Sequence, residues 1–305
     1  MAICLNTIRS TRLTKATLPL CKFLLTTLLV LQSIEIVADA SSAQAAMENS
    51  ANPLLLLSSS KGDIYLELFP AEAPNNVANF IALAQGTEAD ASENDSAAPL
   101  LQTSRSPQYF DGVRFHRVIP EFIIQAASPS YHVLGAPDEV LSDEINANAL
   151  GLDQMPVLNP DGSFHEYLNI ENKADYESRI LEPLYKEMGI ISNSQVRERQ
   201  QEILEALQQL TVKVAYENLG YEYSNRLPSH PIIRGTLALA NTGPNSNGPE
   251  FFISLLDANW LTGKYTVIGK VIEGMDIADI IGETVIDPAR YSSLSTVIYS
   301  IRQIN

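Results

Sequence analysis

The stretch YFDGVRFHRVIPEFIIQ, residues 109–125, places a cation, Arg117, among apolar and aromatic residues. An arginine on a strand usually faces solvent or a surface ion pair. Strict alternation over 113–118, however, would put Arg117 on the same face as Val113 and Phe115, which is the pattern of a half-buried strand. A buried guanidinium needs partners or a function. This segment is therefore our first candidate for a functional site.

A second stretch, GTLALANTGPNSNGPEFFI at 235–253, is a loop rich in Gly, Asn and Pro that leads into an apolar run. Taken alone, it predicts a hairpin loop. Short runs of apolar, β-branched or aromatic residues recur along the chain between Gly, Pro and Asn residues, and they predict strands. These runs lie at 54–57, 63–69, 113–125, 232–240, 250–256, 265–272 and 297–301.

Helical spacing is confined to other parts of the chain. We predict a helix over 75–84, opened by Pro74 and stopped by Gly86, and a second over 275–281. Apolar residues recur at helical spacing between a capping Ser194 and Gly220, which predicts one long helix there. A shorter helical segment at about 173–188 is interrupted by Pro183.

The amino-terminal segment has the composition of a targeting sequence. Its first 34 residues contain no acid, and they include four basic residues and an apolar run at 23–31. Two A-x-A sites follow, at 38–40 and 43–45. These features are typical of a secretory signal peptide. We therefore predict a signal peptide over 1–45, cleaved near 40–46, and a protein that is periplasmic or secreted. An uncleaved amphipathic anchor and an organellar transit peptide are the alternatives.

Composition limits the partners. The 305-residue chain has a formal net charge of −16, which repels phosphate backbones, so we predict no nucleic-acid partner. No stretch reaches the roughly 18 to 20 unbroken apolar residues of a membrane span. Both cysteines lie in the predicted leader, so the mature chain would have none. The histidines lack metal-ligand spacing, so we predict no metal and no cofactor; they are His116, His132, His165 and His230.

Together the two stretches resemble the cyclophilin family of peptidyl-prolyl cis/trans isomerases. The first follows its F-H-R-x-I-x-x-F-x-x-Q pattern and the second its A-N-x-G-P-N-x-N-G-x-x-F-F-I pattern. A third stretch, WLTGKYTVIGKV at 260–271, is similar to the family's W-L-x-G-x-x-x-V-F-G-x-V strand. The similarity covers most of 53–150 and 232–305.

This resemblance implies a mainly β fold, a closed antiparallel eight-stranded barrel capped by two helices. We expect this domain to occupy 46–305 and to be interrupted by a helical insertion at about 155–228. The insertion is longer than the family's usual connection, and the sequence assigns it no role.

The resemblance also implies the site residues. Arg117 would be catalytic, and Trp260 would form the lip of the pocket and a contact for cyclosporin-like ligands. Gln125 would hydrogen-bond the substrate backbone, and His116 is interpreted as a structural histidine beside the arginine. The proline pocket and the site for the preceding residue would be formed by Phe122, Ile123, Phe252, Leu261, Ala240 and Asn241.

Several site positions depart from the family pattern. Glu250 stands where glutamine is usual, and we expect its carboxylate to compete for the Arg117 guanidinium. Tyr265 replaces a frequent histidine, and Ala126 and Ala127 replace two glycines. The implied function is acceleration of X–Pro bond rotation in exported or unfolded polypeptides. The alternative is a proline-peptide-binding or holdase module with weak or no catalysis, which Glu250 and the two alanines would favour.

Overall fold

The computed structural model describes residues 40–86, 108–135, 140–284 and 295–305, all within one compact unit, Ala38–Asn305. The predicted signal peptide therefore lies almost wholly outside the described residues. Among the described residues, no helix combines the length and apolar character that crossing a bilayer requires.

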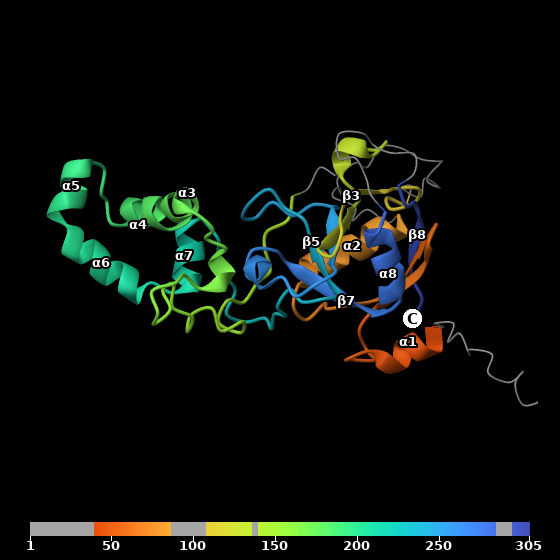
Figure 1. Cartoon of the computed structure of the whole chain (residues 1–305). Coiled ribbons are helices and arrows are strands. Elements are labelled where there is room, and N and C mark those ends of the chain that lie inside the picture. Colours follow the sequence, from red (N-terminus) through yellow and green to blue (C-terminus); the bar gives the residue numbers. More distant parts are fainter. Residues whose placement is uncertain (1–39, 87–107, 136–139, 285–294) are drawn as a thin grey trace, which may run out of the picture. The chain divides into compact units, whose positions relative to one another are not determined.

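Eight antiparallel strands form one curled sheet in the order β3-β4-β6-β5-β7-β2-β1-β8 (Figure 1). Every run that we predicted as a strand overlaps one, and the run at 113–125 overlaps two, β3 and β4. The strands are β1 Leu54–Ser59, β2 Gly62–Leu68, β3 Phe115–Ile119, β4 Ile123–Ala126, β5 Thr236–Leu239, β6 Phe251–Ser254, β7 Val267–Glu273 and β8 Ile298–Gln303.

The sheet is an open half-barrel, so the prediction of a closed barrel is wrong. Its two edges are β3 and β8. Within the described part of the chain, they meet at their beginnings, where an isolated bridge joins Arg114 to Val297. Just before this bridge, Gly112 takes a φ of 77°, which turns the chain out of the extended conformation. Backbone hydrogen bonds beside the bridge join Gly112 and Val113 to Ile298, and Phe115 to Thr296.

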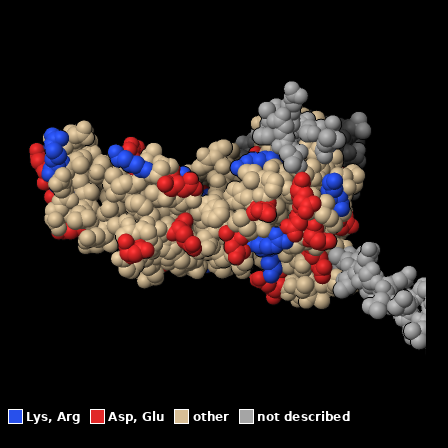
Figure 2. All heavy atoms as spheres, in the orientation of Figure 1, with Lys and Arg blue, Asp and Glu red and all other residues tan. Residues whose placement is uncertain are grey.

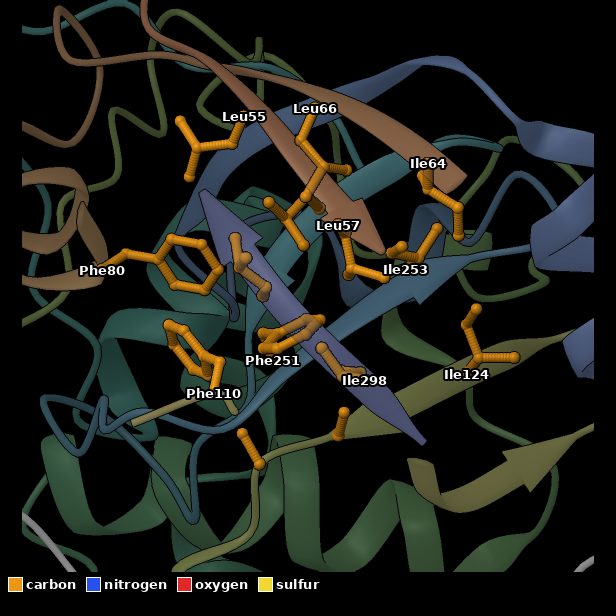
Figure 3. Close-up of a cluster of buried hydrophobic side chains, with 14 of the residues drawn as sticks. Leu55, Leu57, Ile64, Leu66, Phe80, Phe110, Ile124, Phe251, Ile253 and Ile298 are labelled. Atoms are coloured by element: carbon orange, nitrogen blue, oxygen red, sulfur yellow. The ribbon is translucent and has the colours of Figure 1, made fainter. Parts of the chain in front are cut away.

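The core lies on the concave side of this sheet and is built from side chains of most of its strands. Figure 3 shows Phe80, Phe110 and Phe251 facing one another within it. Phe251 meets each of the other two rings edge-on, with centroids 5.5 and 5.7 Å apart. The aliphatic part of the cluster includes Leu55, Leu57, Ile64, Leu66, Ile124, Ile253 and Ile298.

Three helices pack on the sheet: α1 Ala40–Ala46, α2 Pro74–Gln85 and α8 Met275–Gly282. Helix α2 begins at Pro74 and ends at Gly86, whose φ is 69°, so both predicted boundaries are confirmed. The segment after α1 covers part of β2, and Glu67 of that strand is fully buried. Its carboxylate accepts hydrogen bonds from the backbone of Glu48 and Asn49 and from the Asn52 amide. Both faces of β2 are therefore covered.

The remaining helices form the segment that interrupts the sheet between β4 and β5 (Figure 1). It has its own buried cluster, which extends from Ala147 through Leu184 to Tyr216. The helices are α3 Lys173–Tyr176, the π-helical turn η3 Glu177–Leu181, α4 Glu182–Glu187, α5 Asn193–Glu198, α6 Gln200–Gln209 and α7 Val212–Asn218. We call residues 147–223 the helical segment.

The long helix predicted from Ser194 to Gly220 is wrong, because the chain leaves helical geometry twice. The first break is at Arg199, with φ −110° and ψ 23°. The second is at Leu210, with ψ 128°, after which the Thr211 hydroxyl caps α7. Ser192, two residues before the predicted cap, accepts the hydrogen bond that starts α5. Helices α6 and α7 contribute Leu207, Val212 and Tyr216 to one buried cluster, whereas α5 has no buried residue.

Acidic side chains gather on the part of the surface that carries the sheet and α8, as Figure 2 shows for one face. Basic side chains are scattered among them, several in ion pairs such as Arg234 with Asp279. The described residues of this face therefore present no continuous basic patch. This distribution makes a local group of cations in one cavity noteworthy.

Candidate active site

Arg117 is exposed, because a β-bulge changes the direction of its side chain. Pairing between β3 and β4 shifts register between Phe115 and Arg117. Phe115 and Val118 point into the core, whereas Arg117 points outward and stands opposite Gln125. Our expectation that Arg117 shares a face with Val113 and Phe115 is therefore wrong. An extra residue in one strand re-aims the side chains that follow it, and bulges often lie beside active sites for this reason.

A chain of polar contacts fixes the Arg117 guanidinium. One of its terminal nitrogens donates to Gln125 Oε1 at 2.8 Å. The Gln125 amide nitrogen donates in turn to Glu250. The same Glu250 oxygen lies 2.9 Å from His116 Nε2. The order across the site is thus Arg117, Gln125, Glu250 and His116, from the surface inward.

Glu250 does not compete for Arg117, contrary to our expectation, because Gln125 stands between them. Burial alone would raise the pKa of the Glu250 carboxyl, but hydrogen bonds from His116 and Gln125 and the charge of His116 lower it. The group is therefore ionised at neutral pH and can only accept hydrogen bonds. Because Glu250 can only accept, the NH₂ group of Gln125 points toward it. The Gln125 carbonyl oxygen then faces Arg117.

An apolar wall stands next to this polar chain. Gln125 pairs across the sheet with Phe252, which pairs in turn with Ala238. The Phe252 ring meets the Tyr265 ring edge-on, with 5.4 Å between their centroids. The centroids of the Phe122 and Trp260 rings lie 5.8 Å apart. These side chains belong to a buried cluster separate from the main core.

The wall and the polar chain line one cavity of about 380 Å³. The structure brings together in it every site residue inferred from the sequence except Glu250, which lies behind Gln125. The inferred residues in its lining are Arg117, Phe122, Ile123, Gln125, Ala240, Asn241, Phe252, Trp260, Leu261 and Tyr265. Asn241 reaches it with a side chain already bonded to Lys264 O at 3.0 Å.

Three further residues line the cavity and were missed by sequence reasoning: Asn169, Arg179 and Lys264. Lys264 belongs to the third quoted stretch but matches no fixed position of its pattern. Asn169 and Arg179 come from the helical segment, which the resemblance does not cover. No signal in the sequence places them here, because their position depends on how that segment packs.

The two alanines that replace glycines lie outside this lining. Ala127 has a φ of 66° and is buried. A left-handed conformation costs an L-residue about 1–2 kcal/mol relative to the right-handed one. Ala127 in place of glycine therefore puts local strain into the backbone after β4. Neither alanine lines the cavity. Among the described residues, no cluster of His, Cys, Asp and Glu could hold a metal ion.

The fold and the site together define the class of this protein, because an antiparallel curled sheet holds an oriented arginine beside the apolar wall of a cavity. Comparison with protein families agrees. The family model described as cyclophilin type peptidyl-prolyl cis-trans isomerase/CLD matches residues 54–302. The chain therefore belongs to the cyclophilin-type peptidyl-prolyl cis-trans isomerase family.

Individual relatives carry the same description. Peptidyl-prolyl cis-trans isomerase A of Mycobacterium tuberculosis is 26% identical over 247 residues, which cover 80% of this chain and 88% of the relative. Peptidyl-prolyl cis-trans isomerase B of Streptomyces anulatus is 25% identical over 79% of this chain and 90% of its own. A cyclophilin of Cryptosporidium parvum, solved in the presence of the dipeptide Ala-Pro, has a TM-score of 0.43 and 18% identity, covering 83% and 99% of the two chains.

Proposed function

We propose that the protein accelerates cis/trans rotation of X–Pro bonds in polypeptides that have been exported across a membrane. The observation that carries the catalytic part is the position of Arg117, which Gln125 orients in a cavity that has one apolar wall. No covalent bond changes in this reaction, so positioning and hydrogen bonding are sufficient chemistry.

The barrier to this rotation is about 18–20 kcal/mol and comes from amide resonance. As the bond twists, the proline nitrogen becomes pyramidal and gains a lone pair. The Arg117 guanidinium can donate to this lone pair, which exists only in the twisted state, and so stabilises the transition state more than either planar form. Because Gln125 already holds the guanidinium, little reorganisation is needed. Phe122, Phe252 and Leu261 would hold the proline ring while the preceding carbonyl turns.

The direct test is isomerisation of a proline tetrapeptide by the chain lacking its predicted leader. Exchange NMR should detect acceleration at substoichiometric protein. Binding without acceleration would support the proline-binding module instead. Trp260, whose ring lies beside Phe122, is the proposed contact for cyclosporin-like ligands, which should then inhibit the acceleration.

Export is proposed from the leader alone. Mass spectrometry of the protein from its native host is expected to find an amino terminus between Ser41 and Met47. Fractionation of the same cells should recover this form outside the cytoplasm. An intact Met1 on the soluble cytoplasmic protein would contradict export, and it would leave the proposed catalysis untouched.

Loss of the hydrogen-bond acceptor that Glu250 offers to Gln125 is expected to slow catalysis moderately. In Glu250→Ala the Gln125 amide loses the acceptor that fixes its orientation, a hydrogen bond to a charged group worth about 1.5–3 kcal/mol, of which only a part acts on Arg117. We expect kcat/KM on a proline peptide to fall about three- to tenfold. Glu250→Gln is the matched control, because its carbonyl oxygen still accepts from Gln125, and its rate should stay within about twofold of wild type. An unchanged rate in Glu250→Ala would show that Gln125 needs no support.

A further inference from the structure

The cations of the cavity have no acidic counterpart in its lining. Arg117, Arg179 and Lys264 all line it, and no Asp or Glu does. This arrangement occurs in a chain whose net charge is −16. A cleft lined by charges of one sign attracts ligand groups of the other sign. Two of these cations, Arg179 and Lys264, have no part in the catalytic step proposed above.

The helical segment holds Arg179 in place. One terminal nitrogen donates to the backbone oxygens of Leu168, at 3.2 Å, and Asn169, at 2.6 Å. The other lies 3.4 Å from an Asp175 oxygen, and the Arg179 side chain remains 40% exposed. A guanidinium has five N–H donors, so donors remain beyond these contacts. Arg179 stands in the π-helical turn that precedes Pro183, a feature often found at functional sites.

Lys264 is more deeply placed and less neutralised. Its ammonium lies 5.0 Å from the centroid of the Tyr216 ring, which belongs to the helical segment. Among the described residues, no carboxylate lies within ion-pair distance of it. Burial, and then the positive charge of Arg179, lower the pKa of Lys264 to about 8. Arg179 and Lys264 repel each other, so an anion bound between them would stabilise the charged form of Lys264 and the pair as a whole.

The helical segment fixes the part of the sheet domain that carries Lys264. Tyr223 donates to Gly263 O at 2.9 Å, and Asn259 donates to Glu166 Oε1 at 3.0 Å. A Cβ atom at Gly263 would lie 2.5 Å from Leu152, so the packing there is close. The segment thus extends the wall of the cavity beyond Trp260 and Leu261 and adds a charged end to it.

We propose that Arg179 and Lys264 form a subsite for an acidic side chain that neighbours the proline of the substrate. The proposal rests on the proposed function, since it assumes a proline peptide in the cavity. Substrates with Asp or Glu beside proline would be bound in preference to those with the neutral amides.

The test uses peptide pairs that differ in one group. Tetrapeptide amides with Glu or Gln immediately before proline, and a second pair with Glu or Gln immediately after it, are titrated into the protein by calorimetry. For one position we expect the Glu peptide to bind about five- to tenfold more tightly, as for a partly desolvated ion pair. The ratio should shrink as salt is raised. A ratio near one at both positions would overturn the proposal.

Two variants assign the preference to the named residues. Lys264→Met removes the charge and keeps an unbranched chain over Tyr216, and Arg179→Gln removes the second charge. Each is expected to move the Glu-to-Gln affinity ratio toward one. Because Arg179 also holds the backbone of Leu168 and Asn169, Lys264→Met is the decisive variant if Arg179→Gln unfolds. Lys173→Gln is the control, because it removes one positive charge at an exposed position of the same segment, and it should keep the wild-type ratio.

Failure of this proposal can be told apart from failure of the proposed function. Exchange NMR on the same four peptides measures isomerisation, whereas calorimetry measures affinity. Acceleration of all four with equal affinities would refute the acidic subsite and retain the isomerase. Tighter binding of a Glu peptide without acceleration would retain the subsite and refute the isomerase. A Glu preference that survives Lys264→Met and Arg179→Gln together would overturn the assignment to these residues.

Discussion

Arg117→Ala is expected to lower kcat/KM on a proline peptide by about 10²- to 10³-fold, the usual loss when one preorganised donor to a transition state is removed. The fold should be unaffected, because the side chain points outward from β3 and its polar contact is to Gln125 at the surface. Peptide affinity should fall much less, because the apolar wall of Phe122, Phe252 and Leu261 remains.

Arg117→Lys should be nearly as slow as Arg117→Ala. An ammonium is a point charge on a flexible chain and cannot reproduce the planar fork that Gln125 orients. Isomerisation by exchange NMR and affinity by calorimetry separate the two effects. Arg226→Ala is the matched control, because it removes the same charge from an exposed position that does not line the cavity. If wild type binds the peptide and isomerises it no faster than Arg117→Ala, the protein is a binding module.

Gly269→Ala is expected to lower the free energy of unfolding by about 2–3 kcal/mol, the range for overpacking a close contact. Gly269 lies on β7 opposite Leu68 of β2. A Cβ atom there would lie 2.2 Å from the backbone oxygen of Glu67, and only separation of the two strands could relieve that clash. Both strands are central in the sheet, so the displacement would disturb the core on their concave side.

Urea unfolding monitored by circular dichroism measures this loss. Gly248→Ala is the matched control: its φ is not positive and a Cβ atom would meet nothing within 4 Å, so its stability should stay within about 0.5 kcal/mol of wild type. Equal stability of the two variants would show that β2 and β7 can separate without cost. A loss of stability confined to Gly269→Ala would show that the close packing of β2 and β7 requires glycine at this position.

Much of the architecture follows from local sequence. Alternating or β-branched runs between Gly, Pro and Asn predicted the strands, because such residues favour extended backbone and turn residues end it. Pro74 and Gly86 predicted both ends of α2, since proline suits the first helical turn and glycine tolerates the left-handed cap. Through their family resemblance, three motif stretches identified ten of the thirteen residues that line the cavity, because most of the site is formed by contiguous segments of the strands and the loops between them.

Other features depend on contacts between segments that are distant in the sequence, and the order of neighbouring residues does not predict these contacts. Strand alternation assigned Arg117 to the core face, and a bulge, set by pairing with β4, moved it to the surface. Glu250 was expected to face Arg117, but the register of β4 and β6 placed Gln125 between them. Apolar periodicity predicted one continuous helix with Val214 on its apolar face, yet the chain leaves helical geometry at Arg199 and Leu210, and Val214 is exposed.

The sequence by itself therefore determined the strands, the helix α2 and the chemical types that make the cavity, because each of these is encoded within a few neighbouring residues. Tertiary structure alone decided that the sheet is open, that Glu250 supports Gln125, and that Arg179 and Lys264 share one cavity. Arg179 and Lys264 are 85 residues apart in the chain. Arg179 and Lys264 reach the same cavity because the helical segment packs against the Trp260–Tyr265 loop. No residue spacing in the sequence predicts that packing.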